Sequence, residues 1–115
     1  MSNDTNIVDA LVNTTLLTLT PNVERLRFTG EADTYITYQI LNSEDADFAG
    51  DEGTTHDHSY RVDIFSRYDY IALLQQTKAA FKAAGFFGIT VNAEMYEKDT
   101  EYYHASLDIN FKEDL

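Results

Sequence analysis

Residues 56–86, HDHSYRVDIFSRYDYIALLQQTKAAFKAAGF, place a strand pattern directly before a helix pattern. In the first half, Tyr60, Val62 and Ile64 are apolar and the residues between them are charged. A period of two residues is typical of a strand with one buried and one solvent-exposed face. The alternation ends at Phe65, and apolar residues then recur every three to four positions. This stretch therefore predicts a half-buried strand, a sharp turn and a helix.

The predicted helix has a signal at each end. Ser66 precedes Asp69 by three positions, which is the spacing of a capping box, and this places the helix start near Arg67. Gly85 is expected at the C′ position because glycine adopts the left-handed conformation at low cost, and Phe86 then folds back onto the last turn as in a Schellman motif. Between these ends one face carries the apolar residues expected in the core: Tyr70, Leu73, Leu74, Ala80, Phe81 and Ala84.

Weaker patterns predict the elements on either side. A first helix is expected to start at Asn3, Asp4 or Thr5 and to stop at Pro21, with an apolar stripe that includes Val8, Leu11, Val12, Leu16 and Leu19. Residues 23–28 fit either a short strand or an extended lead-in. Firmer strand patterns cover residues 34–42, 88–96 and 102–112, and the last two form a predicted hairpin.

These elements follow one another as helix, two strands, helix, two strands. We therefore predict an α+β fold of order α-β-β-α-β-β, in which an antiparallel four-stranded sheet carries both helices on one face. The exposed edges of this sheet are expected near residues 34–41 and 102–111. No linker or repeat divides the 115 residues, so residues 1–115 are expected to form a single domain.

Charge and composition exclude several classes of function. The net charge of -12 and the isoelectric point near 4.3 argue against binding to nucleic acid or to an anionic membrane, because both need a basic surface. The chain contains no cysteine, which removes disulfides and thiolate metal sites. No apolar run reaches membrane-spanning length and the start MSNDTN lacks a positive signal region, so we expect a soluble protein that is not exported.

An acidic segment interrupts the strand patterns at residues 43–57. Its like charges and glycines predict a mobile surface loop that becomes ordered only against a partner. We therefore treat it as the candidate interface or lumen loop, with these candidate residues: Glu44, Asp45, Asp47, Phe48, Asp51 and Glu52.

The search for chemistry finds no complete site. Asp45, Asp47 and Gly50 match three positions of an EF-hand loop, but His56 stands where a bidentate glutamate belongs. His56 and His58 with His104 are the best candidate zinc ligands, although their spacing is common by chance. Cysteine nucleophiles, a serine elbow and a glycine-rich phosphate loop are all missing from the sequence. We expect no enzyme activity, no cofactor, and no metal requirement for folding.

A series of short motifs resembles the tail-completion proteins of long-tailed bacteriophages and prophages, which are also called tail terminators or head-tail joining proteins. The resemblance covers about residues 30–112, and its strength lies in the order of motifs that are individually weak. The motifs are TYITYQ at 34–39, the acidic segment, YRVDIFS at 60–66, AAGF at 83–86, MYE at 95–97, Asp99-Thr100 and Tyr103-His104.

The resemblance implies a structural virion protein with no catalytic residues. Proteins of this family form a ring, usually hexameric, that caps the tail tube at its head-proximal end and contacts the head connector. The expected partners are further copies of the chain, the tail tube protein and a head connector or stopper protein, with DNA passing through the channel. The expected location is the virion, with assembly in the host cytoplasm. A neighbouring connector adaptor and a non-viral binding module, whose best site would be the three histidines, remain as alternatives.

Overall fold

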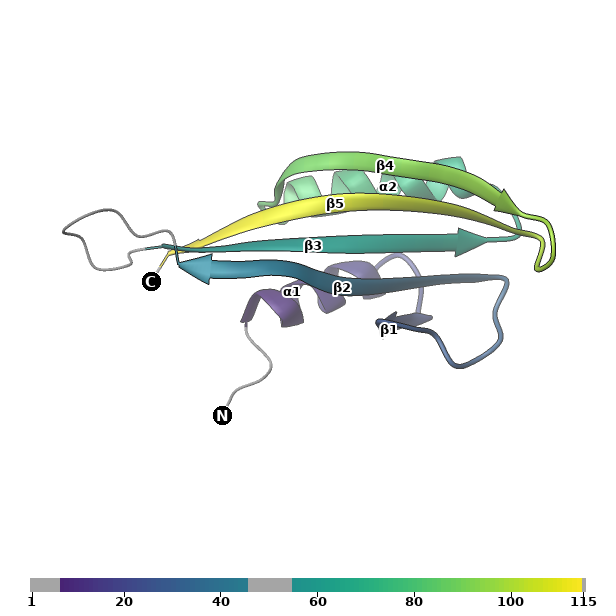
Figure 1. Cartoon of the computed structure of the whole chain (residues 1–115), viewed down its shortest axis with the longest axis horizontal. Coiled ribbons are helices and arrows are strands. Elements are labelled where there is room, and N and C mark those ends of the chain that lie inside the picture. The colour runs from purple at the N-terminus through teal and green to yellow at the C-terminus, as the bar shows by residue number, and fades with distance from the viewer. Residues whose placement is uncertain (1–6, 46–54, 115) are drawn as a thin grey trace.

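The computed structural model describes residues 7–45 and 55–114 of the chain. Two helices and five strands are found within these ranges (Figure 1). In chain order they are α1 (Ile7–Leu17), β1 (Val23–Arg25), β2 (Thr34–Asp45), β3 (Thr55–Ser66), α2 (Tyr70–Ala83), β4 (Phe87–Glu97) and β5 (Tyr102–Asp114).

The sheet is a mixed one. Its strand order is β1-β2-β3-β5-β4; β1 runs parallel to β2, and the three other neighbouring pairs are antiparallel. The prediction of an antiparallel four-stranded sheet was therefore wrong, because the sheet has five strands and the chain order is α-β-β-β-α-β-β. The predicted hairpin is confirmed, since β4 pairs directly with β5.

Backbone hydrogen bonds hold β1, the strand that the prediction left out. The Ile36 N–H donates to the Asn22 carbonyl at 2.9 Å, and the Leu26 N–H donates to the Tyr38 carbonyl at 2.8 Å. Leu26 has a φ of 70°, so the strand is interrupted after Arg25. Every residue type except proline offers both of these backbone groups, and three residues are too few to display a reliable alternation. The sequence pattern alone therefore did not decide between a strand and an extended lead-in for residues 23–28.

The strand order also changes which edges are exposed. β5 lies between β3 and β4, so the predicted edge at residues 102–111 is interior to the sheet. The outer strands are β1, which is three residues long, and β4, which is eleven residues long. Residues 34–41 in β2 lie next to β1 only at Ile36, Thr37 and Tyr38. The edge strands are therefore very unequal in length.

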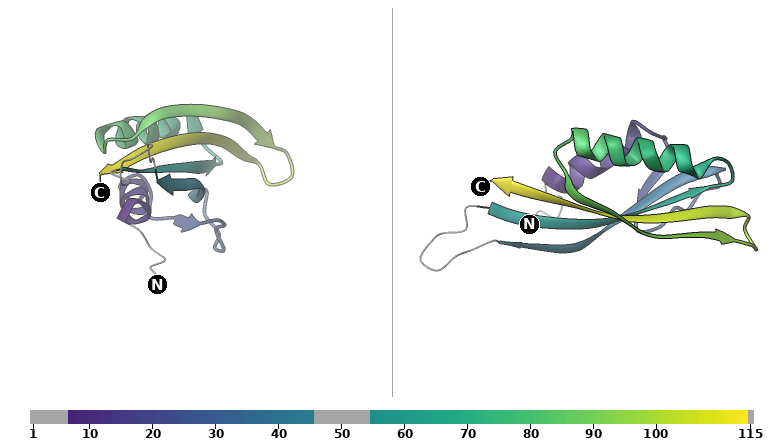
Figure 2. Two further views of the ribbon diagram at one scale, coloured as in Figure 1. Left: turned by 60° about the vertical axis from the view of Figure 1, so that its left-hand side comes forward. Right: turned by 90° about the horizontal axis from the view of Figure 1, so that it is seen from above.

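Both helices pack on the same face of the sheet, as predicted (Figure 2). A single core lies between the helices and the strands. Its fully or nearly fully buried members are Val8, Val12, Leu16, Ile36, Tyr38, Tyr60, Val62, Ile64, Leu74, Phe81, Phe86, Ala105, Leu107 and Ile109. Neither helix of the described part is long and apolar enough to cross a membrane. The opposite face of the sheet is covered by no helix in the described ranges.

Helix α2 begins later than predicted but ends as predicted. Asp69 is the N-cap: its carboxylate accepts from the backbone N–H groups of Ile71 and Ala72 at 3.1 and 3.2 Å. Gly85 has a φ of 98°, and the Phe86 N–H donates to the Phe81 carbonyl at 2.9 Å. The rings of Phe81 and Phe86 meet edge to face at 5.0 Å, which completes the Schellman arrangement.

Ser66 is a residue of β3 and takes no part in capping the helix. Its hydroxyl accepts from the Tyr68 N–H at 3.1 Å and bonds the Thr34 hydroxyl at 3.1 Å. The capping-box prediction was therefore wrong, because Asp69 caps the helix itself instead of reaching back from the third helical position.

The acidic segment is shorter than predicted at both ends. The backbone at Glu44 and Asp45 belongs to β2 and pairs with Asp57 and His56 of β3. Strand pairing uses backbone groups, so an acidic composition does not prevent it. The other candidate residues of this segment, Asp47, Phe48, Asp51 and Glu52, lie outside the described residues. Their assignment to an interface stays a prediction.

Candidate interaction surface

One row of side chains crosses the sheet on the face opposite the helices. The strand register places Tyr35 of β2 beside Phe65 of β3, Phe65 beside His104 of β5, and His104 beside Met95 of β4. These four residues come from four different motifs of the family resemblance. Motifs that are spread over about seventy residues of sequence are thus brought together on one surface by strand pairing.

The rings of this row are stacked on one another. Centroid distances are 4.8 Å from Phe28 to Tyr35, 4.5 Å from Tyr35 to Phe65 and 4.1 Å from Phe65 to His104, and each pair is nearly parallel. We call Phe28, Tyr35, Phe65 and His104 the aromatic row. Tyr35–Phe65 and Phe65–His104 are pairs across neighbouring strands, and such pairs stabilise the strand register.

Tyr102 and Arg67 close the row at the turn end of the sheet. The Tyr102 ring meets Tyr35 edge-on at 5.3 Å, and its hydroxyl donates to the Ala32 carbonyl. The Arg67 guanidinium lies 4.4 Å from the Tyr102 centroid, and its Nε donates to the Thr100 carbonyl at 3.3 Å. Arg67 therefore joins the loop before α2 to the β4–β5 turn by a cation–π contact and a hydrogen bond.

Several polar groups on this face pair with one another, although the buried Asp57 Oδ1 accepts no hydrogen bond from a described residue. Nε2 of His104 lies 2.9 Å from Asp63, and its Nδ1 lies 3.6 Å from Glu97. Arg61 forms a two-point contact with Asp108, with nitrogen–oxygen distances of 2.9 and 3.3 Å, and this hydrogen bond raises the pKa of Arg61. Asp63 occupies Nε2 of His104, whereas the buried Nδ1 forms no hydrogen bond with a described residue. The arrangement is suited to a structural surface.

The three histidines do not form one site. His58 is 2% exposed and bonds Glu113 at 3.0 Å, and its ring stacks on that of His56 at 4.5 Å. The alternation along β3 and β5 puts His56 and His58 on the helix side of the sheet and His104 on the other side. No three His, Asp or Glu side chains of the described part are grouped to hold a metal ion. The zinc alternative thus loses its third ligand.

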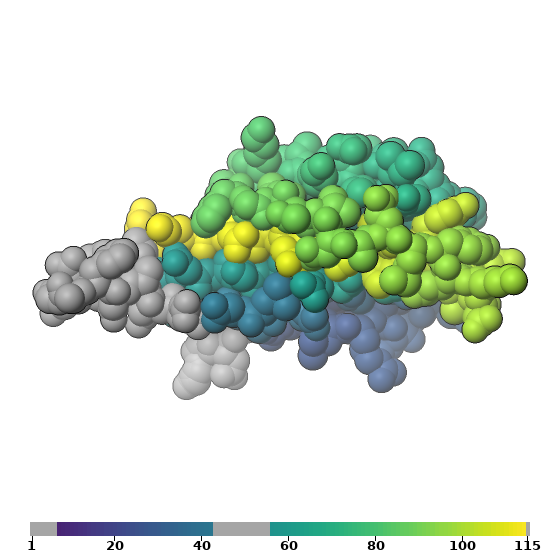
Figure 3. All heavy atoms as spheres, turned by 45° about the horizontal axis from the view of Figure 1, so that its top comes forward, coloured from purple at the N-terminus to yellow at the C-terminus, as the bar shows by residue number. Residues whose placement is uncertain are grey.

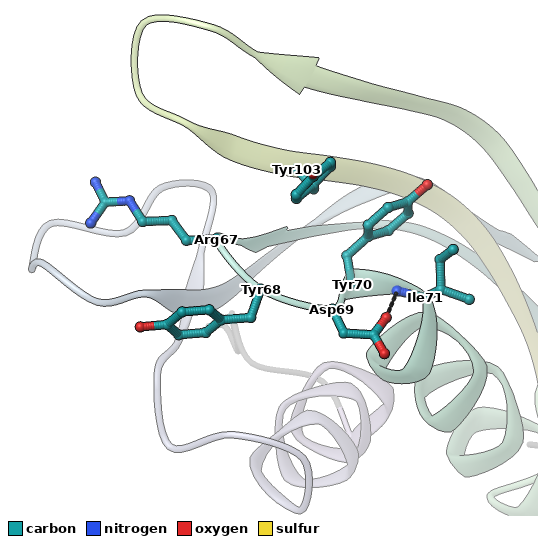
Figure 4. Close-up of a pocket in the computed structure, with 6 residues that line it drawn as sticks. All are labelled: Arg67, Tyr68, Asp69, Tyr70, Ile71 and Tyr103. Carbon is teal, nitrogen blue, oxygen red and sulfur yellow. Dashed lines mark hydrogen bonds between the residues drawn. The ribbon is translucent and has the colours of Figure 1, made fainter.

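A second aromatic group lies on the helix side, at the start of α2. Tyr70 stacks on Tyr103 at 5.3 Å, and Tyr103 contacts Tyr96 at 4.9 Å. The Tyr70 hydroxyl donates to Glu94 at 2.7 Å, and this hydrogen bond raises the pKa of Tyr70. An open hollow of about 530 Å³ adjoins these rings (Figure 4). Its lining residues are Arg67, Tyr68, Asp69, Tyr70, Ile71 and Tyr103.

Strand β4 forms one side of the molecule and has a largely exposed surface. In the space-filling view its light-green side chains face the viewer, between those of α2 and β5 (Figure 3). Three of its large apolar side chains, Phe87, Met95 and Tyr96, are each about half exposed. Exposed apolar side chains on a sheet edge are typical of a surface that contacts another chain.

Sequence reasoning found the strands of this surface but not the surface itself. The alternation places Tyr35 and His104 on the side of their strands away from the predicted core, but it ends at Phe65 and gives no strand order. The usable signal was the recurrence of an aromatic ring or histidine at the turn-proximal end of three strands.

Comparisons with known proteins add little. No family model matches the chain, and no curated protein matches it. One solved structure with a similar arrangement is a chain described as "Virion of native gene transfer agent (GTA) particle". The sequences are 16% identical, the TM-score is 0.47, and the match covers 93% of this chain and 87% of that one. A likeness of that size assigns no function to this chain.

Proposed function

We propose that this chain is a structural virion protein that forms a ring at the head-proximal end of a bacteriophage tail tube. There it ends growth of the tube and joins the tail to the head connector. The observation that carries the proposal is that four motifs of the family resemblance, which are individually weak, meet on one face of the sheet at Tyr35, Phe65, His104 and Met95. A shared surface is a reason for those motifs to occur together in one chain.

The form of the molecule also fits assembly into a ring. A closed ring needs a heterologous contact, in which one surface of a copy meets a different surface of the next copy. The two edges of this sheet differ in length and in side chains. The β4 edge of one copy can therefore meet a different edge of the next copy, as well as another β4 edge. The proposed stoichiometry is six, and that number comes from the resemblance alone.

The charge of the chain suits a channel that conducts DNA without holding it. Twenty acidic residues stand against eight basic ones, so most surfaces that a ring of this chain presents to its lumen are negative. Phosphate binding needs Lys and Arg, and a negative wall repels the DNA backbone and lets it slide. The proposed partners are the tail tube protein and a head connector or stopper protein. The role needs no catalysis, cofactor or membrane.

Labelling of purified particles tests the proposal. An antibody raised against the chain, carried on gold particles, should label virions of the source strain at a single position between head and tail. For the control, the gene is deleted from the strain and supplied on a plasmid. The same antibody is then applied to particles made with expression from the plasmid and to particles made without it. Intact particles without label, or label on the capsid surface or tail tip, would overturn the proposal.

A further inference from the structure

The outer edge of β4 consists of two different halves. Its first half is irregular, with register shifts between Phe87 and Thr90 and between Val91 and Ala93. From Ala93 to Glu97, however, five consecutive residues pair with β5 in regular register. Bulges are one way in which proteins protect an edge strand from pairing with another chain. The second half of β4 lacks this protection, and it contains no proline.

The side chains of this regular half are both apolar and acidic. Met95 and Tyr96 are 52% and 51% exposed. Glu94 and Glu97 flank them along the strand. A surface of this kind attracts a partner segment that presents a basic residue next to an apolar one.

The opposite edge of the same chain presents such a segment. Arg25, Leu26 and Arg27 follow one another at the end of β1, and together the two arginines are a quarter of the eight basic residues. Leu26 is 68% exposed. Arg25 lies 3.7 Å from Asp9, whereas Arg27 forms no ion pair with a described residue. Residues 23–27 also contain Glu24, so this segment has one more basic than acidic residue in a chain of net charge -12, and in this respect it is the complement of the β4 edge.

We infer that residues 93–97 of β4 bind residues 23–27 of a second copy of this chain. Each copy then uses one edge toward each neighbour, which is the head-to-tail contact that builds a ring or a filament. Closure of this series of contacts into a ring rests on the proposed function. The pairing of the two edges rests on the exposure of both, on the regular register of residues 93–97 and on opposite local charge.

Paired charge reversals test the contact. Arg27→Glu makes the β1 edge acidic and Glu94→Lys makes the β4 edge basic, so each variant places like charges together and should weaken self-association about tenfold. An equal mixture of the two variants should regain association, because each copy then meets a neighbour of opposite charge. Sedimentation equilibrium at protein concentrations up to millimolar measures the self-association of four samples: each variant alone, their mixture and the unchanged chain.

Matched controls separate the contact from general effects of charge and folding. Lys82→Glu makes the same change of charge as Arg27→Glu, but on the exposed side of α2, and should leave association unchanged. Tyr70→Phe removes the hydrogen bond that Glu94 accepts without changing any charge, and it should also have no effect. Equal unfolding temperatures will show that the variants are folded.

Cysteine cross-linking gives a second readout, since the chain has no cysteine of its own. Exposed Glu24 and Ala93 are replaced by cysteine singly and together, and a short bismaleimide is added. The double variant should give a ladder of multimers, and each single variant should stay monomeric. Dimers from the Ala93→Cys variant alone would show an isologous contact and overturn the inference. Failure of the double variant to cross-link, or reversals without effect, would also overturn it.

The two proposals fail in different experiments. If the antibody labels virions at the head–tail junction but the double cysteine variant gives no ladder, the proposed function stands and this contact is ruled out. If the double cysteine variant gives a ladder and the mixed charge reversals regain association, but the chain is absent from virions, the contact stands and the proposed function is ruled out.

Discussion

Tyr38 shows how burial changes the chemistry of a single side chain. Its ring lies in the core beneath α1, and its hydroxyl accepts a hydrogen bond from the Asn13 amide at 3.2 Å. Burial raises the pKa of Tyr38 above the ordinary value of 10.0, and the Asn13 hydrogen bond lowers it by less. Burial is also the main reason that the pKa of Tyr35 is raised. Both hydroxyls therefore keep their protons at a higher pH in the folded chain than in the unfolded one.

We predict that the free energy of unfolding falls as the pH rises above 10.0. In that range the unfolded chain releases tyrosine protons that the folded chain retains, so rising pH favours unfolding. Below it the contribution of these tyrosines is fully present. Tyr38→Phe removes one such group and should give a shallower fall in urea titrations at several alkaline pH values. Parallel curves for the variant and the unchanged chain would contradict this account.

Gly85 shows how one backbone angle fixes a residue type. A Cβ added there would lie 3.5 Å from a ring carbon of Phe111, which is an ordinary contact, so space is available. The φ of 98° is nevertheless unfavourable for a residue with a side chain. Gly85→Ala should lower the free energy of unfolding by about 1–2 kcal/mol. Gly85→Asn should lose less, because asparagine tolerates this region better; equal losses would place the cause elsewhere.

At the scale of elements, two polar residues near the start of α2 make contacts of different kinds. Asp69 accepts from two first-turn N–H groups, whereas Ser66 joins β3 to β2. The sequence spacing of these two residues suggested one joint motif. In the structure each of them serves a different element.

We predict that Asp69→Ala lowers the free energy of unfolding by about 1 kcal/mol and speeds hydrogen exchange at Ile71 and Ala72. Those two N–H groups lose their acceptor when the carboxylate is removed. Ser66→Ala is the matched control: it also destabilises, because Ser66 is buried, but it should leave exchange at the two helix amides unchanged. Faster exchange at both amides in Ser66→Ala would contradict this separation and show that the contact of Ser66 with β2 also holds the start of the helix.

At the scale of the whole molecule, net charge opposes folding. With a charge of -12 on 115 residues, carboxylates repel one another more strongly in the folded chain than in the extended one. Individual pairs such as Arg61–Asp108 and Arg67–Asp33 relieve part of this repulsion locally. The remainder is long-range and sensitive to screening by salt, because the Debye length falls to about 8 Å at physiological ionic strength.

We therefore predict that the unfolding temperature rises when sodium chloride is added from low to physiological ionic strength. The measurement is a thermal unfolding curve followed by circular dichroism at neutral pH. Glu24→Gln and Glu31→Gln, introduced together at exposed positions, should reduce the size of the rise. An unfolding temperature that falls with salt would mean that the ion pairs outweigh the repulsion.

The sequence by itself determined the local structure of this chain. Periods of two and of three to four residues marked β3 and α2, and Gly85 marked the helix end, because side-chain alternation and glycine conformation are properties of neighbouring residues. The tertiary structure alone decided the strand order, the addition of β1 and the position of β5 inside the sheet. Those features depend on hydrogen bonds between backbone groups, which every residue except proline can donate, so the side-chain alternation along one strand does not reveal them.

The candidate surface divides in the same way. Three residues of the aromatic row, Tyr35, Phe65 and His104, were visible as members of separate strands, but only the registers Tyr35–Phe65 and Phe65–His104 stacked them into one surface. The three histidines appeared to form one set in the sequence, and the strand pleat placed them on opposite faces. Sequence patterns assign a residue to a side of its own strand, and only the packing of distant strands decides which residues meet.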